Sequence, residues 1–146
     1  MSRAEQPYPL GQPAADAADG ALSISFPAVA GSLASVRDAA VAFASQADLS
    51  QDTVEAVRLV CSEAAANVVE HAYPGSDGEI HLRAVRNSEA LWVVVADDGQ
   101  GLRLRPDKRS TGFGFGWMAR FSDAMTLEPG PGGGLEVSFR FGVSDR

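Results

Sequence analysis

The sequence contains a single cysteine, Cys61, among its 146 residues. One thiol cannot close an internal disulfide or supply a cysteine-rich zinc site, and a chain without disulfides is typical of a reducing cytoplasm. The small apolar neighbours Val60 and Ala64 predict that Cys61 is a buried hydrophobic residue. Neither His71 nor His81 has a Cys/His set at ligand spacing, so we interpret them as a helix-end and a strand-surface residue.

Basic clusters and long apolar segments are missing as well. With 12 Lys and Arg against 19 Asp and Glu, the formal net charge is -7, which disfavours direct nucleic-acid binding. The longest apolar run, Ala90 to Ala96, is far below the roughly 20 residues of a membrane-spanning helix, and the N-terminus has no apolar signal-peptide region. We therefore expect a cytoplasmic protein with no membrane partner.

Length and composition predict one folded domain. A chain of 146 residues, 45% of them hydrophobic, is long enough for a single core and lies within the roughly 100–200 residues of a typical domain. Residues 1–20 are rich in Pro, Ala, Gly and Asp without a period. We predict a flexible leader there, outside the fold, and a folded domain over residues 21–146.

Hydrophobic periodicity predicts an α+β fold. Apolar positions spaced by three and four indicate amphipathic helices, whereas alternation indicates half-buried strands and a continuous apolar run indicates a strand covered on both faces. The expected elements are a strand at 22–26, a helix at 33–47, a helix capped by Ser50 and ending near Ala72, strands at 79–86 and 91–96, a short helix at 117–124, and strands at 125–128 and 135–141. This order indicates a two-layer α/β sandwich with helices on one face of a mixed, mostly antiparallel sheet.

The second predicted helix carries polar residues on the flank of its apolar stripe. Glu63 and Asn67 are spaced by four and share one face, which Glu70 extends, and the small residues at 64–66 leave room beside them. An ordinary solvated helix edge would explain the same pattern.

A second feature is Asp97-Asp98-Gly99-Gln100-Gly101, directly after the buried strand. A carboxylate at the end of an apolar strand is costly to desolvate unless a donor reaches it, and a ligand amine is one such donor. The glycines permit close approach of the backbone. A plain strand-end turn is the alternative.

A third feature is Gly112-Phe113-Gly114-Phe115-Gly116, which follows the basic pair Lys108-Arg109 and precedes a predicted helix. Glycines that lead into a helix N-terminus expose backbone N–H groups, which is how many proteins bind phosphates. The segment contains no Walker Gly-Lys-Ser/Thr, and Trp117 excludes Gly-x-Gly-x-x-Gly. A flexible loop with aromatic plugs is the alternative.

The order of the three features is more specific than any one of them. Glu-x-x-x-Asn, then Asp-x-Gly-x-Gly, then Gly-x-Gly-x-Gly resembles the N, G1 and G2 boxes of the Bergerat-fold, histidine-kinase-like ATPases. Residues 62–73, Ser-Glu-Ala-Ala-Ala-Asn-Val-Val-Glu-His-Ala-Tyr, are similar to the N box of the anti-sigma factor serine/threonine-protein kinases. The closing pattern Gly-x-x-Val-x-Phe at 134–139 is similar to that family too, and the resemblance spans about residues 22–142.

The resemblance implies a role for each box. Asn67 would ligate Mg²⁺ together with the ATP phosphates, Glu63 would orient or deprotonate the attacking serine, and Asp97 would accept a hydrogen bond from the adenine amino group. Each role suits the residue's chemistry, since amide oxygen is a hard ligand and a carboxylate accepts protons. The remaining nucleotide contacts that the resemblance implies are Gly99 and Gly101 near the base, and Gly112, Gly114, Gly116 and Arg109 around the phosphates.

The resemblance also implies the partners. We expect an ATP-binding anti-sigma factor that sequesters a sigma factor, phosphorylates a serine on an anti-anti-sigma antagonist protein and forms a homodimer. Two alternatives remain open: a non-catalytic ATP-dependent protein-binding module of the same fold, and an ATPase-like subunit of another signalling system. One departure is Asp98-Gly99-Gln100-Gly101 in place of the commoner Asn-Gly-Pro-Gly, which removes a rigid proline and adds a negative charge near the nucleotide.

Overall fold

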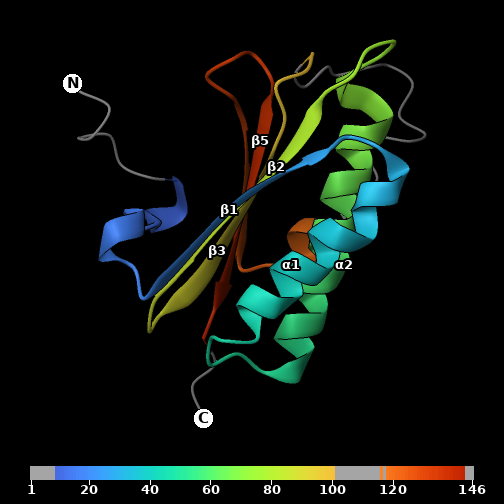
Figure 1. Ribbon diagram of the computed structural model, residues 1–146. Coiled ribbons are helices and arrows are strands. Elements are labelled where there is room, and N and C mark those ends of the chain that lie inside the picture. The colour runs from blue at the N-terminus through green and yellow to red at the C-terminus, as the bar shows by residue number, and fades with distance from the viewer. Residues whose placement is uncertain (1–8, 101–115, 117, 144–146) are drawn as a thin grey trace, which may run out of the picture.

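The computed structural model describes residues 9–100, 116 and 118–143 (Figure 1). Its strands form one sheet in the order β1-β2-β3-β5-β4. The predicted α+β sandwich is confirmed. We predicted a mixed, mostly antiparallel sheet, and every pairing between the described strands is antiparallel. The strands are β1 (Gly20–Pro27), β2 (Glu79–Arg86), β3 (Ala90–Ala96), β4 (Ala124–Pro129) and β5 (Leu135–Gly142).

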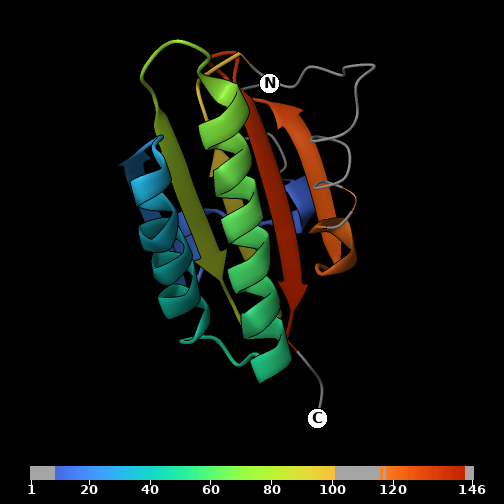
Figure 2. The same ribbon diagram turned by 90° about the vertical axis from the view of Figure 1, so that its right-hand side faces the viewer.

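Two long helices, α1 (Leu33–Ala44) and α2 (Gln51–Asn67), lie side by side across one face of the sheet (Figures 1 and 2). Ser50 caps α2 as predicted, because its side chain accepts a hydrogen bond from the backbone N–H of Thr53 at 3.1 Å. The helix reaches Ala72, but its last part, η5 (Val68–Ala72), has π-helical geometry. None of the described helices combines the length and apolar character needed to cross a bilayer.

The core lies between these helices and the sheet. All seven residues of β3 are buried, as expected of a central strand covered on both faces. Cys61 is fully buried, and burial raises the pKa of its thiol to about 12, which confirms that it is a core residue. The largest fully buried side chains are Phe139, Ile80, Leu82, Leu91 and Met118.

The opposite face of the sheet carries part of the N-terminal segment. Short 3-10 turns, η2 (Pro9–Gly11) and η3 (Ala15–Ala17), lie on the side away from α1 and α2 (Figure 1). The indole N–H of Trp92 donates a hydrogen bond to the carbonyl oxygen of Leu10 at 2.9 Å, and Leu10 packs against the cluster that Trp92 forms with Val85 and Ala90. The prediction that the leader lies outside the fold is therefore wrong for residues 9–19, because the apolar outer face of β3 recruits them.

Candidate functional site

The site begins where β3 ends, at two consecutive carboxylates that lie on opposite faces of the sheet. Val93 and Val95 pack into the core beneath the helices, so the strand alternation directs Asp97 to the helix side and Asp98 to the outer side. The backbone N–H of Asp97 donates to the carbonyl of Leu135 at 3.0 Å, which continues the β3–β5 ladder into the site. The two acids therefore have separate environments.

Asp97 is a buried carboxylate held at one oxygen. Only 6% of the Asp97 surface is exposed to solvent. Its Oδ1 atom accepts hydrogen bonds from the backbone N–H groups of Gly99 (2.9 Å) and Leu135 (3.4 Å). Within the described residues Oδ2 has no hydrogen-bond donor. Burial raises the pKa of Asp97; the two backbone donors oppose this shift, and the neighbouring charge of Asp98 adds to it. Within the described part of the chain, the carboxyl group is therefore fixed through Oδ1 alone.

Gly99 and Gln100 join this loop to the end of η5. A Cβ atom on Gly99 would lie 2.0 Å from the carbonyl oxygen of Ala72, so the structure shows glycine here to be required by loop-to-helix packing. Gln100 donates from its backbone N–H to the Ala72 carbonyl at 2.9 Å and from Nε2 to the His71 carbonyl at 2.6 Å. These two hydrogen bonds hold the loop at position 100, where the commoner Asn-Gly-Pro-Gly sequence has a proline.

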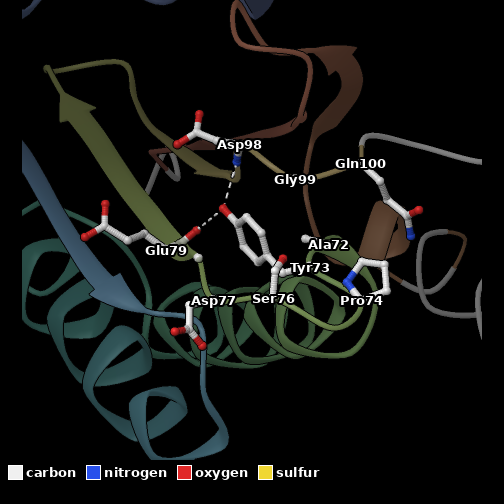
Figure 3. A pocket seen from close by; sticks show the side chains of 10 residues that line it. Ala72, Tyr73, Pro74, Ser76, Asp77, Glu79, Asp98, Gly99 and Gln100 are labelled. Carbon is white, nitrogen blue, oxygen red and sulfur yellow. Dashed lines mark hydrogen bonds between the residues drawn. The ribbon is translucent and has the colours of Figure 1, made fainter.

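Tyr73 braces the same loop from below. Its hydroxyl donates to the carbonyl oxygen of Glu79 at 2.7 Å and accepts from the backbone N–H of Asp98 at 2.9 Å (Figure 3). An open pocket of about 550 Å³ lies here between the 73–79 turn and the loop. Its lining includes Gly99 but not Glu63, Asn67 or Asp97, so it adjoins the predicted site without coinciding with it.

Glu63 and Asn67 lie one turn apart on α2, and both are half-buried. The Nδ2 atom of Asn67 is buried and has no hydrogen-bond partner among the described residues. A solvated helix edge would leave this amide in water, so that alternative does not describe Asn67. Buried polar atoms are rarely left unpaired in proteins, so this amide is able to bond a water molecule, an ion or a ligand.

The phosphate-side residues are only partly described. Gly116 is exposed and helical, as are residues 118–120, and a Cβ atom on Gly116 would meet open space. Gly101, Arg109, Gly112 and Gly114 lie outside the described residues. The structure therefore brings together the N-box helix and the Asp97 loop, and leaves the phosphate-side predictions untested.

Sequence reasoning did not predict the contacts through which Tyr73, Gln100 and His81 shape this site. Tyr73 and Gln100 hold the loop through hydrogen bonds to main-chain atoms, and no sequence pattern predicts such bonds. His81, expected as a strand-surface residue, lies on β2 and bonds Asp98, with 2.6 Å between His81 Nε2 and Asp98 Oδ2. The strand register was the available signal, since His81 pairs with Ala96 and therefore shares a face with Asp98.

Comparison with known proteins agrees with this geometry. Residues 26–141 match the family model described as histidine kinase-like ATPase domain. The chain is 30% identical over 131 residues to an anti-sigma F factor of Clostridium beijerinckii, covering 82% of this chain and 92% of that protein. It is 23% identical to an anti-sigma F factor of Bacillus licheniformis, covering 80% and 88% respectively. The chain belongs to the histidine kinase-like ATPase domain family, and both relatives named above are anti-sigma F factors.

Proposed function

We propose that the protein is an anti-sigma factor with serine/threonine-protein kinase activity. It binds ATP with Mg²⁺, holds a sigma factor and transfers phosphate to a serine on an antagonist protein. Family membership and the names of the relatives support the anti-sigma role. The observation that carries the proposal is the Asp97 carboxylate, buried with Oδ1 held by two backbone N–H groups and Oδ2 without a donor in the described structure.

Asp97 has the chemistry needed to select adenine. An exocyclic amino group donates hydrogen bonds, and an ionised carboxylate with a free oxygen accepts them. A hydrogen bond to a charged group contributes about 1.5–3 kcal/mol, and an unpaired buried carboxylate loses at least as much in desolvation. Base binding would therefore supply Oδ2 with a donor, which none of the hydrogen bonds among the described residues provides.

Asn67 has the chemistry to hold magnesium together with phosphates. A half-turn of its amide exchanges Nδ2 and Oδ1, so this buried position presents either a donor to phosphate or a hard oxygen to the ion. The described residues contain no group of three or more His, Cys, Asp or Glu side chains that would hold a metal ion alone. This fits Mg²⁺, which in nucleotide sites is commonly held by one or two side chains plus substrate phosphates. When bound, the ion neutralises charge on the phosphates.

Glu63 is the carboxylate that accepts the proton in this proposal. The antagonist's serine oxygen bonds to the γ-phosphorus while the bond from that phosphorus to the bridging oxygen breaks, giving phosphoserine and ADP. The serine hydroxyl proton goes to Glu63, which lies one helical turn before Asn67. Gly112, Gly114, Gly116 and Arg109 would complete the phosphate contacts, and Gly99 and Gly101 would lie near the base. The proposal also includes a homodimer, which analytical sedimentation tests.

The decisive test compares Glu63→Gln with the wild type in phosphate transfer from labelled ATP to the co-purified antagonist. Glutamine keeps the shape and hydrogen bonding of Glu63 but cannot accept the proton, and a general base contributes about 10²–10⁴-fold to rate. We expect the variant to lose most of the transfer while retaining nucleotide and sigma-factor binding. Glu70→Gln, on the exposed part of η5, is the matched control and should leave the rate unchanged.

Two outcomes would overturn parts of the proposal. Wild-type protein that binds ATP and the antagonist but never labels it is a binding module of the same fold instead of a kinase. Pull-down partners that include no sigma factor would assign the chain to another signalling system.

A further inference from the structure

A hydrogen-bonded chain of three side chains crosses the outer face of the sheet beside the nucleotide site. Ser25 on β1 and His81 on β2 are direct cross-strand partners, with 2.7 Å between Ser25 Oγ and His81 Nδ1. The other ring nitrogen, Nε2, lies 2.6 Å from Oδ2 of Asp98. The chain therefore connects the edge strand to the loop that carries Asp97.

Donor and acceptor chemistry fixes the direction of these bonds. An ionised carboxylate only accepts hydrogen bonds, so the His81 Nε2–H group is the donor to Asp98 Oδ2. In a neutral ring Nδ1 then accepts from the Ser25 hydroxyl, and in a charged ring the same hydroxyl accepts from Nδ1. Ser25 can meet either need, so the bond to Asp98 persists in both protonation states of His81.

Asp98 is held at its backbone as well as at its side chain. Its backbone N–H donates to Tyr73 Oη at 2.9 Å on one side of the loop, and its carboxylate bonds His81 on the other. Asp97 precedes this doubly anchored residue directly. Fixing the peptide between the two acids fixes where the Asp97 carboxylate lies.

The neighbouring cation, Arg83, is paired with another carboxylate, not with Asp98. Arg83, two residues along β2 on the same face, has its Nη2 atom 3.3 Å from Oε1 of Glu136. His81 and Arg83 therefore each have their own carboxylate partner. His81 also opposes the effect of Asp98 on its neighbour, since the Asp98 charge raises the pKa of Asp97 and the His81 interaction lowers it.

We propose that His81, oriented by Ser25, is a positioning residue for the base-binding loop: through Asp98 it holds Asp97 in place for the nucleotide. This rests on the proposed function for its effect on binding, whereas its effect on the loop is independent of any ligand. It also explains how the chain accommodates an acidic residue at position 98, because His81 pairs that charge and directs it to the outer face.

A double-mutant cycle tests the route through Asp98. We expect His81→Ala and Asp98→Ala each to weaken nucleotide binding about three- to tenfold in calorimetry, since the pair is partly exposed to solvent. His81→Ala should have no further effect in the Asp98→Ala background. The same loss in both backgrounds, or no loss in either, would overturn the proposal. Arg83→Ala is the matched control and should bind like the wild type.

Measurements without nucleotide separate this proposal from the proposed function. Nitrogen chemical shifts of the His81 ring should show the Nε2–H form, with the second tautomer appearing in Ser25→Ala. Amide exchange at Asp98 and Gly99 should accelerate about three- to tenfold in His81→Ala, and His81→Gln should restore part of the protection because its amide still donates. If wild-type protein binds no nucleotide yet these changes occur, the proposed function fails and the positioning role stands. Unchanged exchange in His81→Ala would end the positioning role whatever the protein binds.

Discussion

A Cβ atom on Gly134 would lie 1.9 Å from the carbonyl oxygen of Asp97. The turn before β5 therefore packs directly against the backbone that carries the site carboxylate. The next residue, Leu135, donates its backbone N–H to Asp97 Oδ1 at 3.4 Å and accepts from the Asp97 N–H at 3.0 Å. The start of β5 thus supports Asp97 together with the loop, although it is almost 40 residues away in sequence.

Replacing Gly134 by Ala should both destabilise the protein and weaken nucleotide binding. The added methyl group meets backbone, which cannot move aside as a flexible side chain would, and such overpacking costs about 1–3 kcal/mol. Thermal melting and nucleotide titration measure the two effects. Gly132→Ala is the control in the same turn, because its Cβ would meet only Asp98 Oδ1 at an ordinary 3.6 Å. Equal melting temperatures for the two variants would show that the contact is not tight.

Asp97→Asn should weaken ATP binding while stabilising the protein without nucleotide. Loss of a charged hydrogen-bond acceptor corresponds to about 1.5–3 kcal/mol, roughly ten- to hundredfold in affinity. Burial raises the pKa of Asp97, so its contribution to stability is greatest below the ordinary value of 3.8 and falls as the pH rises through the raised pKa. Asparagine removes the buried charge present at neutral pH.

Melting curves across pH check the sign of this effect. The advantage of Asp97→Asn over the wild type should be present at pH 7 and shrink toward pH 4, where the wild-type carboxyl group is increasingly protonated. An advantage that grows on acidification, or unchanged affinity in a folded variant, would remove Asp97 from the proposed base-binding role.

Asn67→Ala should abolish the magnesium-dependent part of nucleotide binding and leave the free protein as stable as the wild type. The Nδ2 atom has no partner in the described structure, so the substitution removes no hydrogen bond seen there. Titrations with and without Mg²⁺ give the first quantity, and thermal melting without nucleotide gives the second. A variant that melts well below the wild type would show that Asn67 is a structural residue.

The sequence predicted best what depends on local pattern. Residues 79–86 form a strand with the predicted bounds because their alternation matches one buried face, and the Ser50 cap needs only the next turn of helix. The position of Asp97 followed from its place after a buried strand. Contacts between distant segments were not predictable: Gln100 reaches the His71 carbonyl across 29 positions, and Trp92 reaches Leu10 across 82.

The N-terminal segment, predicted as a leader, shows why amino-acid composition does not predict contacts between distant segments. Its Pro, Ala and Gly content resembles a disordered segment, and too little apolar surface is present for it to fold alone. The missing information was the outer face of β3, where Trp92 needs a hydrogen-bond acceptor for its indole N–H once it is buried. The contacts with Trp92 on the sheet therefore order an N-terminal segment whose own composition predicts disorder.

Removing residues 1–18 should therefore uncover Trp92 and destabilise the domain. Leu10 and Ala18 pack against the cluster of Val85, Ala90 and Trp92, and losing these contacts and the hydrogen bond corresponds to about 1–3 kcal/mol. The truncation keeps Asp19, whose backbone N–H donates to the Arg86 carbonyl at 2.8 Å, so the β1–β2 edge stays intact. In a Trp117→Phe background the remaining fluorescence reports Trp92 alone, and its emission should shift to longer wavelength.

A conservative variant separates the hydrogen bond from the apolar contact. Trp92→Phe keeps a buried aromatic ring but removes the N–H that Leu10 accepts, so it should lower the stability of the full chain by about 1 kcal/mol. In the truncated chain the N–H has no such acceptor, and the same substitution should be close to neutral. An equal effect in both chains would mean that the leader contributes packing alone, and an unshifted emission after truncation would mean that it does not cover Trp92 in solution.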